Sequence, residues 1–148
     1  MISFSRSQVV GAEFPAEDTI RFHGVQEDHI YGMEIVMDVR ISSGEILSIR
    51  GDMKRYTTFV CPRAIPVLES AVGVSLRKDG WDKRIMREIG RKGCEHFAEI
   101  IIECGRSLET ALLSRALWEE LKKDPGLDQE TFLQTRVARE VRSGAEGR

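Results

Sequence analysis

The sequence predicts an α+β fold in which an N-terminal antiparallel sheet of about four strands is followed by three to four helices. In the first half, apolar and polar residues alternate, as they do in a strand with one buried face. In the second half, apolar residues recur every three or four positions, which is the spacing of a helix that buries one face. Because the spacing changes once, we expect the strands first and the helices after them.

The expected strands cover residues 8–14, 18–25, 29–41 and 46–53. The clearest is the third, in which every odd position from Tyr31 to Ile41 is apolar. The segment "SSGE" (42–45) is typical of a turn, so the third and fourth strands form a hairpin. The side chains expected to face the helices are Ile20, Phe22, Met33, Ile35, Met37, Val39, Leu47, Ile49 and Met53.

The expected helices cover residues 62–72, 79–90, 93–123 and 128–142. In the first, the apolar stripe consists of Ile65, Leu68 and Val72. The third is interrupted by Gly105 and ended by "DPG" (124–126). We therefore expect one α+β domain over residues 1–123 and a charged helical extension over 124–148, partly disordered at the final "SGAEGR".

Composition excludes several classes of protein. The 148-residue chain has 41% hydrophobic and 31% charged residues, as ordinary soluble proteins do. Its net charge of −2 argues against nucleic-acid binding through excess positive charge. No apolar run reaches the roughly 18 residues that cross a bilayer, so no membrane partner is expected. The first residues lack a secretory pattern, and we expect a cytoplasmic protein whose cysteines are thiols or metal ligands.

Two of the three cysteines stand where helices are expected to begin. Cys61 precedes Pro62, a residue favoured in the first turn of a helix, and Cys94 follows Gly93, which lets the chain turn sharply. The unpaired N–H groups and the positive dipole of a helix start favour a thiolate, the form that binds metal or attacks carbon. The nearby cations Arg63, Arg91 and Lys92 favour it further.

Two histidines complete a candidate metal site. His96 lies two residues after Cys94, and His29 has the same strand parity as Met33, so it should face the helices. Together, Cys61, Cys94, His96 and His29 form a Cys2His2 set suited to zinc or to an iron centre. We expect the two cysteines to share this site.

Two other interpretations remain open. Cysteines are often packed as small apolar residues, which would fit a non-catalytic interaction or assembly protein. A thiol enzyme is the second alternative, with Cys94 or Cys61 as nucleophile and His96 as base. Cys104 lies in an apolar stripe and is expected in the core, and His23 is expected to be solvated.

The order of these motifs resembles the U-type (NifU-like) iron–sulfur cluster scaffold. "CPRAI" (61–65) is similar to that family's second cysteine site, and "CEHFAE" (94–99) to its third. At the first site, His29 stands where the scaffold has a cysteine and Tyr31 where it has an aspartate. The resemblance implies the same fold and a bound metal or iron–sulfur group. The missing aspartate implies a retained ion rather than the assembly and transfer of clusters.

Residues 1–120 also resemble an uncharacterised bacterial family with a Gly-Cys-x-His signature. "CPRAIPVLESAVG" (61–73) and "GCEHFAE" (93–99) are the matching segments. This resemblance implies no activity.

The segment 77–92 is rich in basic residues, which are Arg77, Lys78, Lys83, Arg84, Arg87, Arg91 and Lys92. With Arg50, Lys54 and Arg55 they could form a positive rim that binds an anion or an acidic protein partner. A solvated helix face is the alternative.

Overall fold

The computed structural model describes the backbone of residues 1–146 and the side chains of residues 1–138. The chain divides into two compact units, which are residues 1–106 and 107–148. The first unit contains the sheet and the helices that follow it. The expected domain boundary after residue 123 coincides with the end of a helix, α3 (Leu108–Lys123), and stays a prediction.

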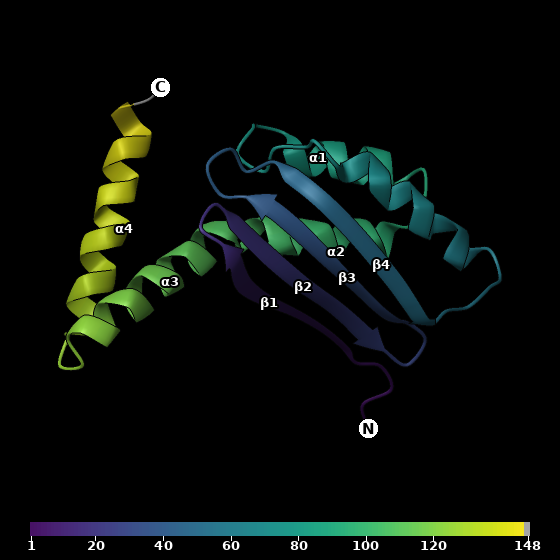
Figure 1. Cartoon of the computed structure of the whole chain (residues 1–148). Helices are drawn as coiled ribbons and strands as arrows, with labels where there is room; N and C mark the ends of the chain where they lie inside the picture. The colour runs from purple at the N-terminus through teal and green to yellow at the C-terminus, as the bar shows by residue number, and fades with distance from the viewer. Residues whose placement is uncertain (147–148) are drawn as a thin grey trace. The chain divides into compact units, whose positions relative to one another are not determined.

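The sheet has four antiparallel strands in the order in which they occur along the chain, β1-β2-β3-β4 (Figure 1). They are β1 (Arg6–Ala16), β2 (Thr19–Asp28), β3 (Gly32–Arg40) and β4 (Ile46–Arg55). Register aligns Phe22 with Met37 and Met37 with Ile49, so alternate residues of neighbouring strands share one face. The predicted α+β class, with strands first and helices after, is confirmed.

Within the first unit the helices cover one face of this sheet (Figure 1). They are η1 (Cys61–Ala71), a 3₁₀ helix; α1 (Trp81–Ile85), which a π-helical turn continues as η2 (Met86–Gly90); and α2 (Glu95–Arg106). The largest core side chains are Ile20, Phe22, Met33, Ile35, Met37, Ile46, Leu68, Ile85, Ile89, Phe97, Ile100 and Ile101. Burial of this apolar surface is the main force that holds the layers together.

Two glycines let α2 and η1 approach the sheet closely. A Cβ atom added to Gly24 of β2 would lie 2.4 Å from Ile100 Cγ2, and one added to Gly51 of β4 would lie 2.5 Å from Leu68 Cδ1. Neither distance is possible for a real side chain without movement. The helices are therefore packed against backbone at these two points.

Two details of the expected core were wrong. In β4 the residue that faces the core is Ile46 rather than Leu47, because a bulge between Asp38 and Val39 shifts the register by one residue. In η1 the buried residues are Ala64, Leu68 and Ala71. Pro66 lies inside that helix and cannot donate an α-helical hydrogen bond, and the tighter 3₁₀ winding changes which residues face inward.

The second unit consists of α3 (Leu108–Lys123) and α4 (Gln129–Glu146). Asp128 directly precedes α4, and its carboxylate accepts hydrogen bonds from the backbone N–H of Glu130 and from the hydroxyl of Thr131. Of the final "SGAEGR", residues 143–146 continue α4, and residues 147–148 lie outside the described part of the chain. Across the part of the chain that is described, no helix combines the length and apolar character needed to span a membrane.

Candidate functional site

Cys61, Cys94, His96 and His29 lie in segments at the end of the sheet where β2 turns into β3. This end contains the β2–β3 turn (29–31), the segment 56–60 that leads into η1, and the start of α2. Cys61 and Cys94, the first candidate ligands, are both half-buried free thiols there.

Cys61 is held at the start of η1 by two threonines. The hydroxyl oxygens of Thr58 and Thr57 lie 3.4 and 3.6 Å from its sulfur, and its N–H donates to the carbonyl of Thr58. Hydrogen bonds from Thr58, and then from Thr57, lower the pKa of the Cys61 thiol to about 7. The lowered pKa increases the fraction of Cys61 side chains that are nucleophilic thiolates near neutral pH.

Cys94 and His96 form a pair just outside and just inside α2. Cys94 precedes the first residue of the helix, and its N–H donates to the carbonyl of Ile89. Its sulfur lies 3.9 Å from Nδ1 of His96. The expected pairing at a helix start is therefore present, because Cys94 does not have to follow helical geometry.

Tyr31 connects the two cysteine sites. Its ring lies against the ring of His96, with centroids 4.3 Å apart, and its hydroxyl lies 3.3 Å from the hydroxyl oxygen of Thr57. Cys61 and Cys94 are thus linked through Thr57, Tyr31 and His96. Their sulfurs have different partners, and the expected sharing of one site by the two sulfurs stays a prediction.

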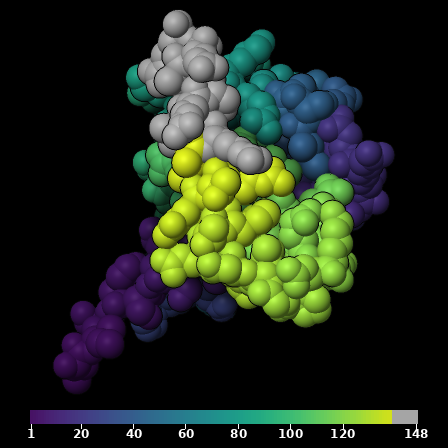
Figure 2. Space-filling view, turned by 90° about the vertical axis from the view of Figure 1, so that its left-hand side faces the viewer, coloured from purple at the N-terminus to yellow at the C-terminus, as the bar shows by residue number. Residues whose placement is uncertain are grey.

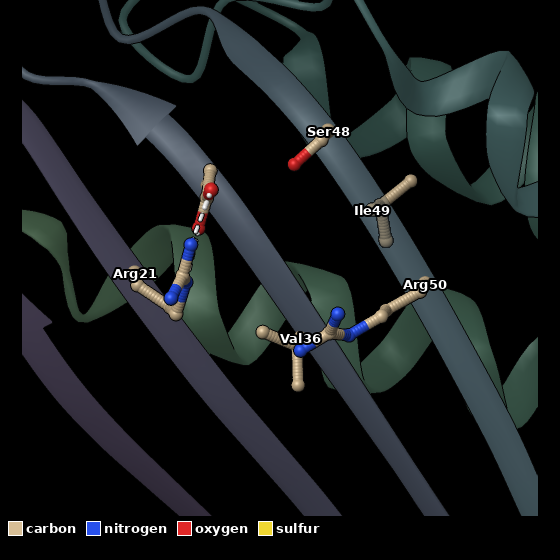
Figure 3. Close-up of a pocket in the computed structure, with 6 residues that line it drawn as sticks. Arg21, Val36, Ser48, Ile49 and Arg50 are labelled. Carbon is tan, nitrogen blue, oxygen red and sulfur yellow. Dashed lines mark hydrogen bonds and ion pairs between the residues drawn. The ribbon is translucent and has the colours of Figure 1, made fainter. Parts of the chain in front are cut away.

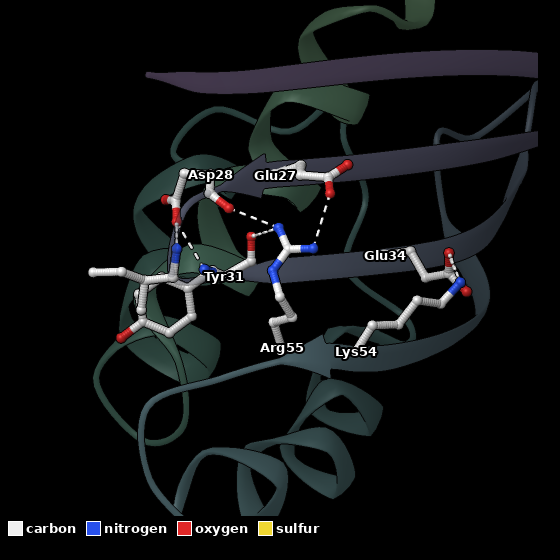
Figure 4. Close-up of polar contacts among 7 residues, drawn as sticks. Glu27, Asp28, Tyr31, Glu34, Lys54 and Arg55 are labelled. Carbon is white, nitrogen blue, oxygen red and sulfur yellow. Dashed lines mark hydrogen bonds and ion pairs between the residues drawn. The ribbon is translucent and has the colours of Figure 1, made fainter. Parts of the chain in front are cut away.

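Asp28 positions Tyr31, and sequence analysis missed this role. Its buried carboxylate accepts hydrogen bonds from the N–H groups of Ile30 and Tyr31, both at 2.7 Å (Figure 4). It also accepts one from Nε of Arg6 at 2.9 Å. The hydrogen bond from the backbone N–H of Tyr31 is the largest cause that lowers the pKa of Asp28, to about 2. The backbone N–H of Ile30 and the side chain of Arg6 contribute to the same shift. An aspartate at a strand end, two and three residues before the groups it binds, is a recognisable turn signal.

Arg55 closes the turn from the β4 side. Its guanidinium donates to the backbone carbonyls of Asp28 and Tyr31, at 2.6 and 3.3 Å, and to the carboxylate of Glu27 at 3.0 Å (Figure 4). Part of the predicted basic rim is thus occupied by structural contacts. Lys54, next to it, pairs with Glu34 at 3.0 Å.

His29 does not face the helices as expected. β2 ends at Asp28 and β3 begins at Gly32, so the alternation that was extended back from Met33 does not continue through the turn. His29 is exposed, and its ring lies 6.4 Å from that of Phe4.

Two other predictions are confirmed: Cys104 is fully buried, and His23 is exposed and bonds Glu13 at 3.1 Å. Burial raises the pKa of the Cys104 thiol to about 12, which keeps it protonated.

The four expected metal ligands are not gathered into one group. Among the described residues, no three His, Cys, Asp or Glu side chains lie close enough together to hold a metal ion. The phenol of Tyr31 lies between the Thr57–Cys61 side and the His96–Cys94 side instead. Zinc or iron binding by Cys61, Cys94, His96 and His29 stays a prediction.

Several exposed apolar side chains lie in segments at the same end of the sheet as Cys61. They come from the N-terminal residues, the β2–β3 turn and the segment before η1, and are Ile2, Phe4, Ile30, Tyr56, Phe59 and Val60. The first residues of the chain stand out from the sheet (Figure 2). Exposed apolar groups gathered at one end of a molecule are typical of a surface that binds another molecule.

The open face of the sheet holds a depression of about 240 Å³, lined by Arg21, Val36, Asp38, Ser48, Ile49 and Arg50 (Figure 3). Arg21 bonds both carboxylate oxygens of Asp38, at 2.7 and 2.9 Å, and this pairing lowers the pKa of Asp38. Figure 3 shows Arg50 reaching across toward Val36. Because cross-strand ion pairs of this kind stabilise a sheet, the depression is explained without a ligand.

These observations define a small α+β protein with two half-buried thiols at one end of its sheet. The chain belongs to DUF2889, a family of proteins of unknown function, whose model matches residues 12–109. The matched region contains the end of β1, all of β2, β3 and β4, and Cys61, Cys94 and His96. No curated protein and no solved structure matches the chain, and the likeness to U-type scaffolds stays a prediction.

Proposed function

We propose that this protein acts in thiol–disulfide exchange, with Cys61 as the nucleophile. The observation that supports it is the pair of threonine hydroxyls on a half-buried sulfur, which lower the pKa of Cys61 to about 7. A thiol with a pKa near the ambient pH combines a useful thiolate fraction with good nucleophilicity. The other half-buried thiol, Cys94, has His96 as its neighbour and supplies a matched comparison.

In the proposed reaction the thiolate of Cys61 attacks one sulfur of a substrate disulfide. A new disulfide bond forms between Cys61 and that sulfur, the original bond breaks, and the second sulfur leaves as a thiolate that takes a proton from water. No other oxidant or reductant is needed. The exposed Tyr56, Phe59 and Val60 beside Cys61 suit a substrate with apolar groups near its disulfide, such as a peptide segment.

Stopped-flow reaction with 4,4′-dithiodipyridine tests this proposal. At pH 7 the wild type should show one fast phase, which is lost in Cys61→Ser and kept in Cys94→Ser. The fast phase should fall as pH drops below about 7, because the thiolate is then protonated. A fast phase that survives in Cys61→Ser, or one that is lost in Cys94→Ser alone, would show that a residue other than Cys61 reacts and would reject the proposal.

Metal binding is the second candidate, because the Cys94 sulfur and His96 Nδ1 lie 3.9 Å apart at a helix start. A tetrahedral zinc or iron ion held by these two groups needs further ligands, which Cys61 and His29 would supply after local movement of Tyr31. Binding would be linked to protons, since the thiols must lose theirs, and acid would release the ion.

Metal analysis of protein purified without chelator distinguishes the two candidates. For the metal candidate, about one zinc or iron per chain is expected, with less in His96→Ala and unchanged content in His23→Ala. The metal content of His29→Ala shows separately whether His29 is the fourth ligand. If the purified protein contains no metal and still reacts rapidly at Cys61, the metal candidate is rejected and thiol–disulfide exchange is the candidate that remains.

A further inference from the structure

A basic depression lies on the helix that precedes Cys94. Its volume is about 320 Å³, and it is lined by Lys83, Met86, Arg87 and Arg91. The three cations are exposed and Met86 is half-buried. The opposite side of the same helix buries Ile85 and Ile89 in the core, so the three cations form its outward row.

A π-helical turn lies in the middle of this segment. The N–H of Arg91 donates to the carbonyl of Met86 at 3.0 Å, five residues earlier, so the turn contains an extra residue. Lys83, Arg87 and Arg91 follow one another at intervals of four residues, so they lie on the same side of the helical segment and share the depression. A Cβ added to Gly90 would lie 2.6 Å from the sulfur of Met86, so the thioether lies along the bare backbone and forms an apolar part of the lining.

The positive charge of the depression is only partly neutralised. Glu88 pairs with Arg87 at 2.9 Å and also contacts Lys92. These two cations lower the pKa of Glu88 to about 2, so it stays ionised. Within the described part of the chain, Lys83 and Arg91 have no carboxylate ion-pair partner. A positive site therefore remains on a chain whose net charge is −2.

We propose that this depression binds a small organic phosphate carrying two or more negative charges. Guanidinium groups recognise phosphate by paired charge-assisted hydrogen bonds, and a lysine adds a point charge. The volume exceeds what a single inorganic ion needs and falls within the range of small-ligand sites. The thioether of Met86 offers a polarisable surface for the organic part of the ligand. This site is separate from Cys61, and the inference does not depend on thiol exchange.

Isothermal titration calorimetry with adenosine 5′-diphosphate tests the proposal, with pyrophosphate and adenosine as probes of the two halves of such a ligand. Adenosine 5′-diphosphate should bind more tightly than either pyrophosphate or adenosine. Lys83→Gln/Arg91→Gln should weaken binding at least tenfold. Lys78→Gln/Arg84→Gln removes the same charge from the same segment, outside the depression, and should change it by less than about twofold. Circular dichroism checks that both variants remain folded.

A second readout uses the wild type. The methyl resonance of Met86, assigned with Met86→Leu, should move when adenosine 5′-diphosphate is added, and the other methionine methyls should not. Absence of binding, or an unmoved Met86 signal, would reject the site. Equal losses in the two double variants would show diffuse attraction by a solvated basic surface and would also reject it. If pyrophosphate bound as tightly as adenosine 5′-diphosphate, the proposal that the ligand is an organic phosphate would be rejected.

Discussion

The ring of Tyr31 lies against the ring of His96, with their centroids 4.3 Å apart and their planes inclined by 43°. The two residues are far apart in the chain, one in the turn before β3 and the other in the first turn of α2. Their contact joins the sheet end to the helix that begins after Cys94. Through the hydroxyl of Tyr31 it also reaches Thr57 and Cys61.

The ring contact predicts a distinctive NMR signal for His96. The protein has three histidines, and only the His96 imidazole protons should be displaced by the ring current of Tyr31. Tyr31→Phe should preserve the displacement, whereas Tyr31→Leu should remove it. His23, which bonds Glu13, serves as the internal control. Identical His96 shifts in all three proteins would contradict the contact.

Threonine hydroxyls should control the reactivity of Cys61. Alkylation by iodoacetamide should rise with pH and reach half its maximum near pH 7, because hydrogen bonds stabilise the thiolate. Thr58→Val should move the half-point to higher pH and slow alkylation at pH 7 several-fold. Thr57→Val should have a smaller effect, since its oxygen is farther away. The exposed Thr110 provides a matched Thr→Val control. An unchanged half-point in Thr58→Val would show that the threonines do not set the pKa.

Asp28→Asn should lower the thermal midpoint by roughly 5 °C at pH 6. One side-chain oxygen can still accept from the turn, but an amide cannot pair with Arg6 as the carboxylate does.

The pH dependence follows from the lowered pKa. The folded pKa of Asp28 is about 2 and the ordinary value is 3.8, so its stabilising effect is present above pH 4 and is lost as the pH falls toward 2. The difference in thermal midpoint between the wild type and Asp28→Asn should shrink as the pH falls over this range. Asp52→Asn, at an exposed site on β4, controls for loss of one charge. A difference that is constant between pH 6 and pH 2 would assign the effect to packing instead.

Gly24→Ala should destabilise the fold by about 1–3 kcal/mol, because the added methyl group overlaps Ile100 and Cys104. Gly11→Ala, in the neighbouring strand, is the matched control, since its nearest atoms are 4.0 Å away. Urea unfolding measures both. Equal stabilities would mean that α2 does not pack on β2 at this point.

Local patterns were enough to predict the layers. Alternation along β2 and β3 correctly placed Ile20, Phe22 and Met37 in the core, and helical spacing correctly buried Cys104. Such patterns work because each strand or helix presents its apolar side to one common core. The same patterns failed where local geometry interrupts them, at the bulge that brings Ile46 inward and at the turn that exposes His29.

The surroundings of the two thiols depend on contacts between distant parts of the chain. The helix starts at Cys61 and Cys94 were predictable from Pro62 and Gly93, and so was the approach of His96 to Cys94. The position of Tyr31 between them depends on the local turn held by Asp28 and on two long-range conditions, the β3–β4 register and the packing of α2 against Gly24. Each of the two long-range conditions is a packing or hydrogen-bond relation between segments that are separate in the sequence. No repeat or spacing within one segment records it, and it exists only once the sheet and its helices are assembled.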